Sequence, residues 1–225
     1  MDDDNTSVQR DLPAGDFARW VDQMNDALSG ARGVDVPCGG CTACCTSSQF
    51  VHIGPDETET LAHIPAELLF PAPRLPAGNV VLGYDELGHC PMLIDNACSI
   101  YDHRPRTCRT YDCRVFPASG LELADDDKVA ITRQTRRWKF TFPTNAEQTR
   151  HDAIRAAVTF LRDRPDVFPT DAMRPTTTQL AVLAIELHDL FLRRDESTDQ
   201  MTVVRPDPSV VRATLMHRTG ATPPR

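Results

Sequence analysis

The feature that most constrains this chain is the placement of its cysteines. The sequence has 225 residues and eight cysteines, and every cysteine lies between Cys38 and Cys113. This segment is rich in Gly, Pro and Asp and contains few long apolar runs. A segment that buries so little apolar surface needs another source of stability, and metal–thiolate bonds are the cross-links that this composition offers.

The first group of cysteines follows a compact pattern. Residues 38–45 read Cys-Gly-Gly-Cys-Thr-Ala-Cys-Cys, which is C-x2-C-x2-C-C. A C-x2-C spacing lets two thiolates turn round one ion while backbone N–H groups of the turn point at the sulfurs, and the glycines permit that turn. The side chains of adjacent residues diverge, so we expect Cys44 and Cys45 to serve different ions or different parts of one polynuclear site.

The second group of cysteines has the irregular spacing C-x7-C-x9-C-x4-C. We expect these residues to return to the first group as further ligands, carried by a hairpin and the turn that follows it. Eight thiolates are enough for two four-cysteine sites. The predicted metal ligands are Cys38, Cys41, Cys44, Cys45, Cys90, Cys98, Cys108 and Cys113.

The spacing leaves the identity of the metal open between zinc and iron. A C-x2-C-x2-C run followed by a distant Cys-Pro, here Cys90-Pro91, is similar to the bacterial ferredoxin arrangement that holds a [4Fe–4S] cluster. Zinc accepts the same spacings in its all-thiolate sites. Four arginines in the run 104–114 either offset the negative charge of such a centre or only order the turn.

These motifs resemble a known family. The C-x2-C-x2-C-C start, the stretch 90–93 (Cys-Pro-Met-Leu) and the run 98–109 are similar to the YkgJ-type cysteine-cluster family. Its members are described as zinc- or iron-chelating proteins that share eight cysteines, and those cysteines fall on the eight of this chain. The resemblance covers Cys38 to Cys113 and implies chelation of zinc or iron, without defining a reaction.

The pattern of the whole chain predicts an α+β fold in which a small, irregular, metal-stapled region with short strands packs with α-helices. Four regions are expected: an N-terminal arm and amphipathic helix over 1–36, the cysteine-cluster region over 37–117, a strand and helices over 118–219, and a disordered tail over 220–225.

Apolar periodicity predicts the individual elements. Helices are expected over residues 16–30, from 144 to the proline at 165, over 178–194 and within 209–217, with a further helix from 56 that Pro65 interrupts. Strands are expected at 50–53, 80–82 and 138–142, and a small hairpin over 92–101. The acidic run 125–127 is expected to be a solvated turn, and His188 to be a core or surface histidine.

The composition of the chain limits the classes of binding partner that we expect. The formal charge is −8, which argues against a general nucleic-acid coat or a basic membrane-surface protein. No segment reaches the length of a membrane span, and the acidic start of the sequence is unlike a signal peptide. We therefore expect a cytoplasmic protein whose partners are metal ions, with no nucleic acid and no membrane.

Two functions from different classes stay open. The first is a metal-binding protein whose centre is structural or transfers electrons. The alternative is a thiol–disulfide redox enzyme or redox sensor that uses the C-x2-C pairs and the vicinal cysteines. A disulfide scaffold in an oxidising compartment is a third reading. No single thiol is marked as a nucleophile, so the sequence does not decide whether the protein is an enzyme, and a histidine such as His89 could replace a thiolate ligand.

Overall fold

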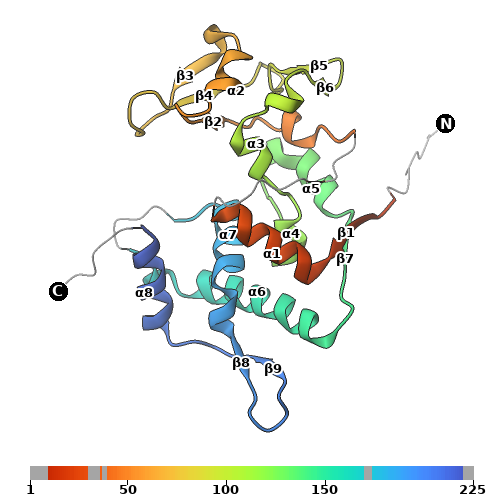
Figure 1. Ribbon diagram of the computed structural model, residues 1–225, viewed down its shortest axis with the longest axis vertical. Helices are drawn as coiled ribbons and strands as arrows, with labels where there is room; N and C mark the ends of the chain where they lie inside the picture. The colour runs from red at the N-terminus through yellow and green to blue at the C-terminus, as the bar shows by residue number, and fades with distance from the viewer. Residues whose placement is uncertain (1–9, 30–35, 37–39, 170–173, 220–225) are drawn as a thin grey trace. The chain divides into compact units, whose positions relative to one another are not determined.

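The computed structural model describes residues 10–29, 36, 40–169 and 174–219 (Figure 1). The predicted arm before residue 10, the tail 220–225 and Cys38 lie outside these ranges. The chain forms two compact units. Unit 1 comprises Met1–Asn25, Arg114–Glu122 and Arg137–Arg225, and unit 2 comprises Asp26–Cys113 and Leu123–Arg136. The α+β class is confirmed, while the division of the sequence at residues 36, 117 and 219 stays a prediction.

The first helix confirms the prediction made from its apolar stripe. Helix α1 spans Phe17–Leu28, and Phe17, Trp20, Val21 and Met24 are all buried. It begins where Asp16 accepts a hydrogen bond from the backbone N–H of the third helical residue, at 3.0 Å, as an N-cap does. The sequence did not predict strand β1 (Leu12–Asp16), which precedes this helix and pairs in parallel with β7 (Trp138–Thr141).

The helical core of unit 1 is built on α6 (Asn145–Asp163). The Thr144 hydroxyl caps the start of α6, because it accepts from the backbone N–H of Glu147 at 3.3 Å. The apolar face of α6 is buried, and α4 (Val115–Ser119) and α7 (Thr177–Leu187) pack on it (Figure 1). A 3-10 turn, η5 (Pro165–Val167), follows α6, and α8 (Pro208–Thr219) confirms the last predicted helix.

The helix predicted over 178–194 is too long. Helix α7 ends at Leu187, a 3-10 turn η6 covers His188–Phe191, and the chain continues into strand β8 (Leu192–Arg194), which pairs with β9 (Met201–Val203). Phe191 is buried as a helical residue would be, so the apolar pattern runs on past the end of the helix. Only the pairing of β8 with a strand further along the chain shows where the helix stops.

Unit 2 contains two small antiparallel sheets. In the first, β4 (Val80–Leu82) lies between β2 (Val51–Ile53) and β3 (Leu69–Pro71). In the second, β5 (Leu93–Ile94) and β6 (Ala97–Cys98) form the predicted hairpin. Pro65 separates α2 (Thr58–Ala62) from a 3-10 turn η2 (Ala66–Leu68), which confirms the predicted interruption. The unit's core cluster consists of Val51, Ile53, Ile64, Leu82, Met92 and Ile100.

Short helices complete unit 2. They are η1 (Ala43–Thr46), η3 (Tyr101–His103), α3 (Arg106–Thr110), η4 (Asp126–Lys128) and α5 (Val129–Thr135). The acidic run 125–127 is exposed, as predicted. Helix α5 returns to pack against η1, although the two are far apart in the sequence.

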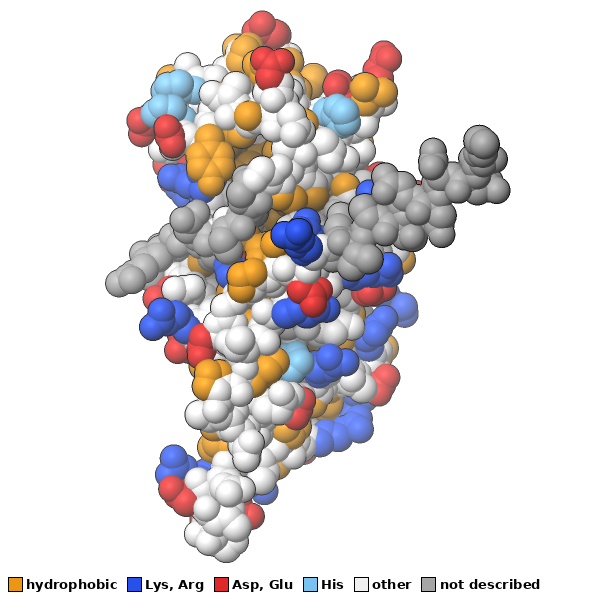
Figure 2. All heavy atoms as spheres, turned by 90° about the vertical axis from the view of Figure 1, so that its right-hand side faces the viewer, with side chains coloured by type: hydrophobic (Ala, Val, Ile, Leu, Met, Phe, Trp, Pro, Cys, Tyr) orange, Lys and Arg blue, Asp and Glu red, His pale blue; other side chains and the backbone are white. Residues whose placement is uncertain are grey.

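Charged side chains of both signs share the surface. On the face in Figure 2, Lys and Arg side chains lie next to Asp and Glu side chains at several places. In unit 1, Arg164 pairs with Asp166 at 2.7 Å and Arg150 with Asp22 at 2.8 Å. Within the described part of the chain, the helices all fall short of the length and apolar character that crossing a membrane requires.

A buried histidine lies where α7 ends. His188 is 1% exposed, and its Nε2 accepts a hydrogen bond from Arg150 Nε at 2.8 Å while its Nδ1 bonds to the carbonyl oxygen of Ile185. Burial lowers the pKa of His188, and the nearby charge of Arg150 lowers it too, against opposing effects of Ile185, Asp189 and Asp22. Since the guanidinium donates to Nε2, the imidazole is held in its neutral form.

We expect unit 1 to lose stability as the pH falls below about 6.5, the ordinary pKa of histidine. Burial lowers the pKa of His188 and of His151 in the folded state. The neutral side chains therefore contribute to the free energy of unfolding above the pKa of the unfolded state, and this contribution is lost as the pH falls through the pKa values of the folded state. Urea unfolding followed by the fluorescence of Trp20 and Trp138, both in unit 1, measures this.

The control for this measurement is an exposed histidine in the same unit. Replacing His188 by Asn removes one titrating group and flattens the pH dependence, whereas replacing the exposed His217 by Asn leaves it intact. An equally steep loss of stability in the His188→Asn variant contradicts the assignment.

Candidate metal centre

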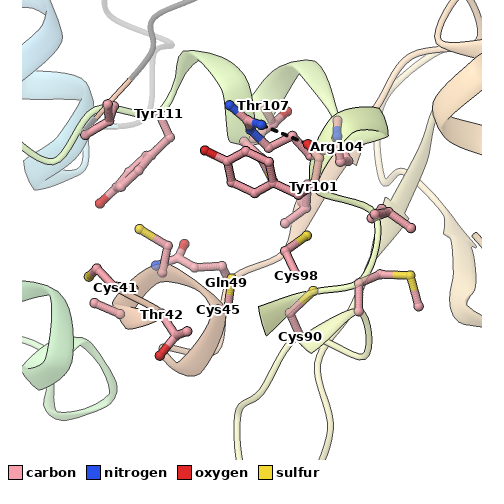
Figure 3. Close-up of a pocket in the computed structure, with 18 of the residues that line it drawn as sticks. Cys41, Thr42, Cys45, Gln49, Cys90, Cys98, Tyr101, Arg104, Thr107 and Tyr111 are labelled. Carbon is pink, nitrogen blue, oxygen red and sulfur yellow. Dashed lines mark hydrogen bonds between the residues drawn. The ribbon is translucent and has the colours of Figure 1, made fainter. Parts of the chain in front are cut away.

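One pocket of unit 2 collects the cysteines. Every cysteine that the structure describes lines this pocket, which has a volume of about 370 Å³ (Figure 3). They come from segments that are distant in the sequence: the chain around η1, the turn before β5, strand β6, and α3 with the residues after it. The lining cysteines are Cys41, Cys44, Cys45, Cys90, Cys98, Cys108 and Cys113. The eighth predicted ligand, Cys38, lies outside the described residues.

The vicinal cysteines lie in the 3-10 turn η1. The backbone N–H of Cys45 donates to the carbonyl oxygen of Thr42 at 2.9 Å, and the Ser47 hydroxyl donates to that of Ala43 at 2.6 Å. A 3-10 helix has three residues per turn, so neighbouring side chains leave it about 120° apart. The side chains of Cys44 and Cys45 therefore leave the turn in different directions.

Lys128 holds the carboxyl end of η1. Its ammonium group donates to the carbonyl oxygens of Ser47 and Ser48 and pairs with Asp127 at 2.7 Å. Gly88 supports the same end, because Ser48 N donates to its carbonyl oxygen at 2.9 Å and a Cβ on Gly88 would lie 2.4 Å from the Ser48 hydroxyl. The role of Lys128 was not predicted from the sequence. The only feature that marks this residue there is that lysine is rare in an arginine-rich chain.

The hairpin β5–β6 brings two more cysteines to the turn. Cys90 N donates to the carbonyl oxygen of Cys45 at 2.7 Å, and Leu93, which follows Cys90 in the same tight turn, pairs with Cys98 across the hairpin. Asp95 and Asn96 have positive φ angles of 49° and 59°, which suits the two central residues of a tight hairpin turn. The register of this hairpin sets Cys90 and Cys98 beside each other.

Backbone N–H groups stabilise the charged form of Cys90. Burial raises the pKa of this thiol, and the charge of Cys98 raises it as well, whereas the N–H groups of Met92 and Leu93 lower it. This is the arrangement of backbone donors around a sulfur that thiolate metal ligands use.

Helix α3 carries Cys108 and is fixed by a buried carboxylate. Glu57, whose side chain is 4% exposed, accepts from the backbone N–H of Arg106 at the start of α3 and from that of Gly54 at 2.9 Å. The residue before the helix, Pro105, has no side chain that can cap it. Glu57 therefore caps the N-terminus of α3 with a side chain that comes from outside the helix. Sequence reasoning missed this residue, because the contact spans 49 residues.

The thiols repel one another electrostatically. Cys108 faces the open pocket and keeps contact with solvent, yet the protein around it limits its hydration. Burial, followed by the negative charges of Cys45, Cys90 and Cys98, raises the pKa of Cys108 to about 12, while the charge of Arg104 lowers it. In metal-free protein at neutral pH this thiol is protonated, and a bound cation has to displace its proton.

The arginines of the run 104–114 divide between the two roles that the sequence left open. Arg104 lines the pocket, donates to the carbonyl oxygen of Tyr101 at 2.8 Å and lies 3.9 Å from the centre of its ring (Figure 3). It orders the turn and also places positive charge near Cys108. Arg106 instead pairs with Asp56, in the loop before α2.

A tyrosine lies near the other cysteines of the pocket. Burial raises the pKa of Tyr111, as do the charges of Cys44, Cys113 and Asp112. In Figure 3, Tyr111 lies on the same side of the pocket as Cys41. Tyr111 was not predicted from the sequence as a residue of the site.

His89, which was considered from the sequence as a replacement for a thiolate, does not line the pocket. Among the described residues that line the pocket there is no histidine. His52 bonds to the Asn79 side chain at 2.9 Å, and His63 stacks on His103 with ring centres 3.7 Å apart. The pocket thus offers sulfur as its donor atom.

The donor chemistry of the pocket fits zinc or iron. Thiolates are soft ligands that favour these metals over calcium or magnesium. Within the described part of the chain, no three Cys, His, Asp or Glu side chains are already grouped as metal ligands. The cysteines therefore face a common space without closing on an ion, so that metal binding would draw η1, the hairpin and α3 together.

The comparison with protein families agrees with this geometry. Residues 37–135 match the family model CxxCxxCC, described as "Putative zinc- or iron-chelating domain". The match confirms the resemblance found in the sequence and extends past Cys113 to the end of α5, so it covers most of both segments of unit 2. It supports chelation of zinc or iron by this domain. No curated protein and no solved structure matches the chain.

We expect replacement of Glu57 by Ala to weaken metal binding although the substitution leaves every thiol in place. The change leaves buried N–H groups at the start of α3 and at Gly54 without their acceptor, which costs about 1–3 kcal/mol. Competition with a chelator measures zinc affinity, and urea unfolding of the zinc-loaded protein measures stability. The matched control is Glu67→Ala at an exposed glutamate of the same unit; equal affinity and stability in the two variants contradict the role of Glu57.

Proposed function

We propose that this protein chelates zinc or iron through its eight cysteines and that the bound metal stabilises unit 2. The proposed ligands are Cys38, Cys41, Cys44, Cys45, Cys90, Cys98, Cys108 and Cys113. The observation that supports this most directly is that cysteines from separate segments of the chain line one pocket. Every described cysteine lies at the same cavity, which is the arrangement that a shared metal centre requires.

The small core of unit 2 supports a structural role. Its core cluster contains few residues, and Cys90 and Cys98 pack against that cluster at the edge of the pocket. Small domains with limited cores commonly depend on a metal for stability. Bound zinc or iron would supply cross-links between chain segments that otherwise meet through short strands and single turns.

The thiol–disulfide alternative receives less support. A reactive cysteine functions as a thiolate, and its pKa is lowered by its surroundings. Burial raises the pKa of both Cys90 and Cys108, which keeps these thiols protonated in the absence of a cation.

We place the protein in the cytoplasm, where reducing conditions keep thiols available to bind metal.

Metal content and colour test the proposal. Protein purified without oxygen is analysed for zinc, iron and acid-labile sulfide, and its visible spectrum is recorded. Colourless protein with stoichiometric zinc supports the structural centre. Brown protein with iron and sulfide supports a [4Fe–4S] cluster and an electron-transfer role. Protein that contains neither metal, and whose eight thiols oxidise reversibly, overturns chelation in favour of thiol redox chemistry.

We expect Cys41→Ser and Cys108→Ser each to lose bound metal and solubility together, because a serine hydroxyl is a poor ligand for zinc or iron and unit 2 depends on its cross-links. Metal analysis after size-exclusion chromatography measures both properties. Thr42→Ser, a change in the same pocket that removes no sulfur, is the control and keeps its metal. Full metal content in both cysteine variants contradicts their assignment as ligands.

A further inference from the structure

We infer that the cysteine pocket contains two separate metal sites and that Cys45, Cys90, Cys98 and Cys108 together form one of them. This inference rests on the proposed chelating function and goes beyond it, because it assigns particular thiols to one ion. The expected ion is a soft divalent cation, zinc or iron, held by four sulfurs. The neighbouring cysteines Cys41, Cys44 and Cys113 do not bind that ion.

Backbone contacts place three of the four ligands together. The hydrogen bond from Cys90 N to the carbonyl oxygen of Cys45 joins the hairpin to η1 at 2.7 Å. The pairing of Leu93 with Cys98 then brings the second strand of the hairpin to the same point. In Figure 3, the side chains of Cys45, Cys90 and Cys98 lie close together at one end of the pocket.

Helix α3 supplies the fourth ligand to this group. Cys108 lines the same pocket as Cys45, Cys90 and Cys98, and Arg104 of the preceding turn lines it as well. The start of α3 is fixed by Glu57, and the Thr107 hydroxyl donates to the carbonyl oxygen of His52 at 2.7 Å. These contacts anchor the helix to β2 and to the loop before α2, and so fix the position of Cys108 on the pocket wall.

The other described cysteines belong to a different part of the pocket. Cys41 lies on the Tyr111 side of the pocket, away from Cys90 and Cys98 (Figure 3), and Cys113 follows Tyr111 by two residues. The directions of adjacent side chains in a 3-10 turn explain how Cys44 and Cys45 point to different groups. The vicinal pair is therefore the point at which the two sites meet.

Charge gives the two sites different surroundings. Four thiolates and one divalent cation carry a net charge of about −2. Arg104 offsets that charge at the site of Cys45, Cys90 and Cys98, and its hydrogen bond and stacking contact with Tyr101 hold it in place. Tyr111 lies on the other side of the pocket, where Cys41 is (Figure 3).

Cadmium-113 NMR tests the assignment directly. The full-length protein is freed of metal, loaded with ¹¹³Cd²⁺ without oxygen, and its ¹H–¹¹³Cd correlations are recorded. We expect one cadmium resonance to couple to the β protons of Cys45, Cys90, Cys98 and Cys108 and to no others. A resonance that couples to Cys45 and also to Cys41, Cys44 or Cys113 overturns the division. Absence of bound cadmium overturns chelation itself, and with it this inference.

The vicinal pair provides matched variants. Cys45→Ser is expected to shift or abolish the resonance assigned to Cys90, Cys98 and Cys108 and to leave any second resonance in place. Cys44→Ser, one residue away in the same turn, is expected to leave the first resonance unchanged. If both variants alter the same resonance equally, the two cysteines share an ion and the inference is wrong.

A substitution of a residue other than cysteine distinguishes an effect of local charge on metal affinity from an effect of general destabilisation. Arg104→Gln is expected to lower the cadmium affinity of the Cys45 site by about tenfold, near the lower end of the range for residues that support metal ligands. Arg104→Lys keeps the charge and restores part of that affinity. Arg106→Gln is the control, because its guanidinium pairs with Asp56; an equal loss in this variant assigns the effect to general destabilisation and contradicts the role of Arg104.

Discussion

The central constraint in unit 2 is that its pocket gathers thiols, which as thiolates repel one another unless a cation binds them. Thiols that share one cavity cannot all ionise without a compensating charge. Burial raises the pKa of Cys108, and the negative charges of the neighbouring cysteines raise it further. A bound metal ion reverses the sign of this effect. Each thiolate that repels its neighbours in the absence of metal forms a favourable bond to the ion. The same close approach of sulfurs thus opposes ionisation without a metal and favours binding with one.

Groups other than cysteine give the pocket its shape. The carboxylate of Glu57 holds α3, the ammonium group of Lys128 holds η1, and the bond from Cys90 N to Cys45 O joins the hairpin to the turn. Each contact joins segments that are far apart in the sequence and satisfies backbone groups at the end of a short element. Unit 1 is different in kind, because apolar packing of α6 with α4 and α7 holds it together and its buried polar groups, such as His188, are few.

Much of the local structure could be predicted from the sequence. The helix at Phe17, the cap at Thr144, the interruption at Pro65 and the turn at Asp95 and Asn96 each follow from residues that lie next to one another in the chain. The end of α7 could not be predicted, because Phe191 continues the apolar pattern and only pairing with β9 stops the helix. Glu57 and Lys128 escaped notice for the same reason, since their partners lie about 50 or more residues away.

The sequence by itself determined the chemistry of the site, because the number of cysteines, their type of donor atom and the C-x2-C-x2-C-C spacing are local properties of the chain. It also indicated that Cys44 and Cys45 diverge. Tertiary structure brought the described cysteines to one pocket, because the bond from Cys90 N to Cys45 O joins the hairpin to η1 and Glu57 holds the start of α3. The type of donor atom can be recognised from residues that are close in the sequence. Which cysteines lie near one another depends on where loops and hairpins bring distant residues together.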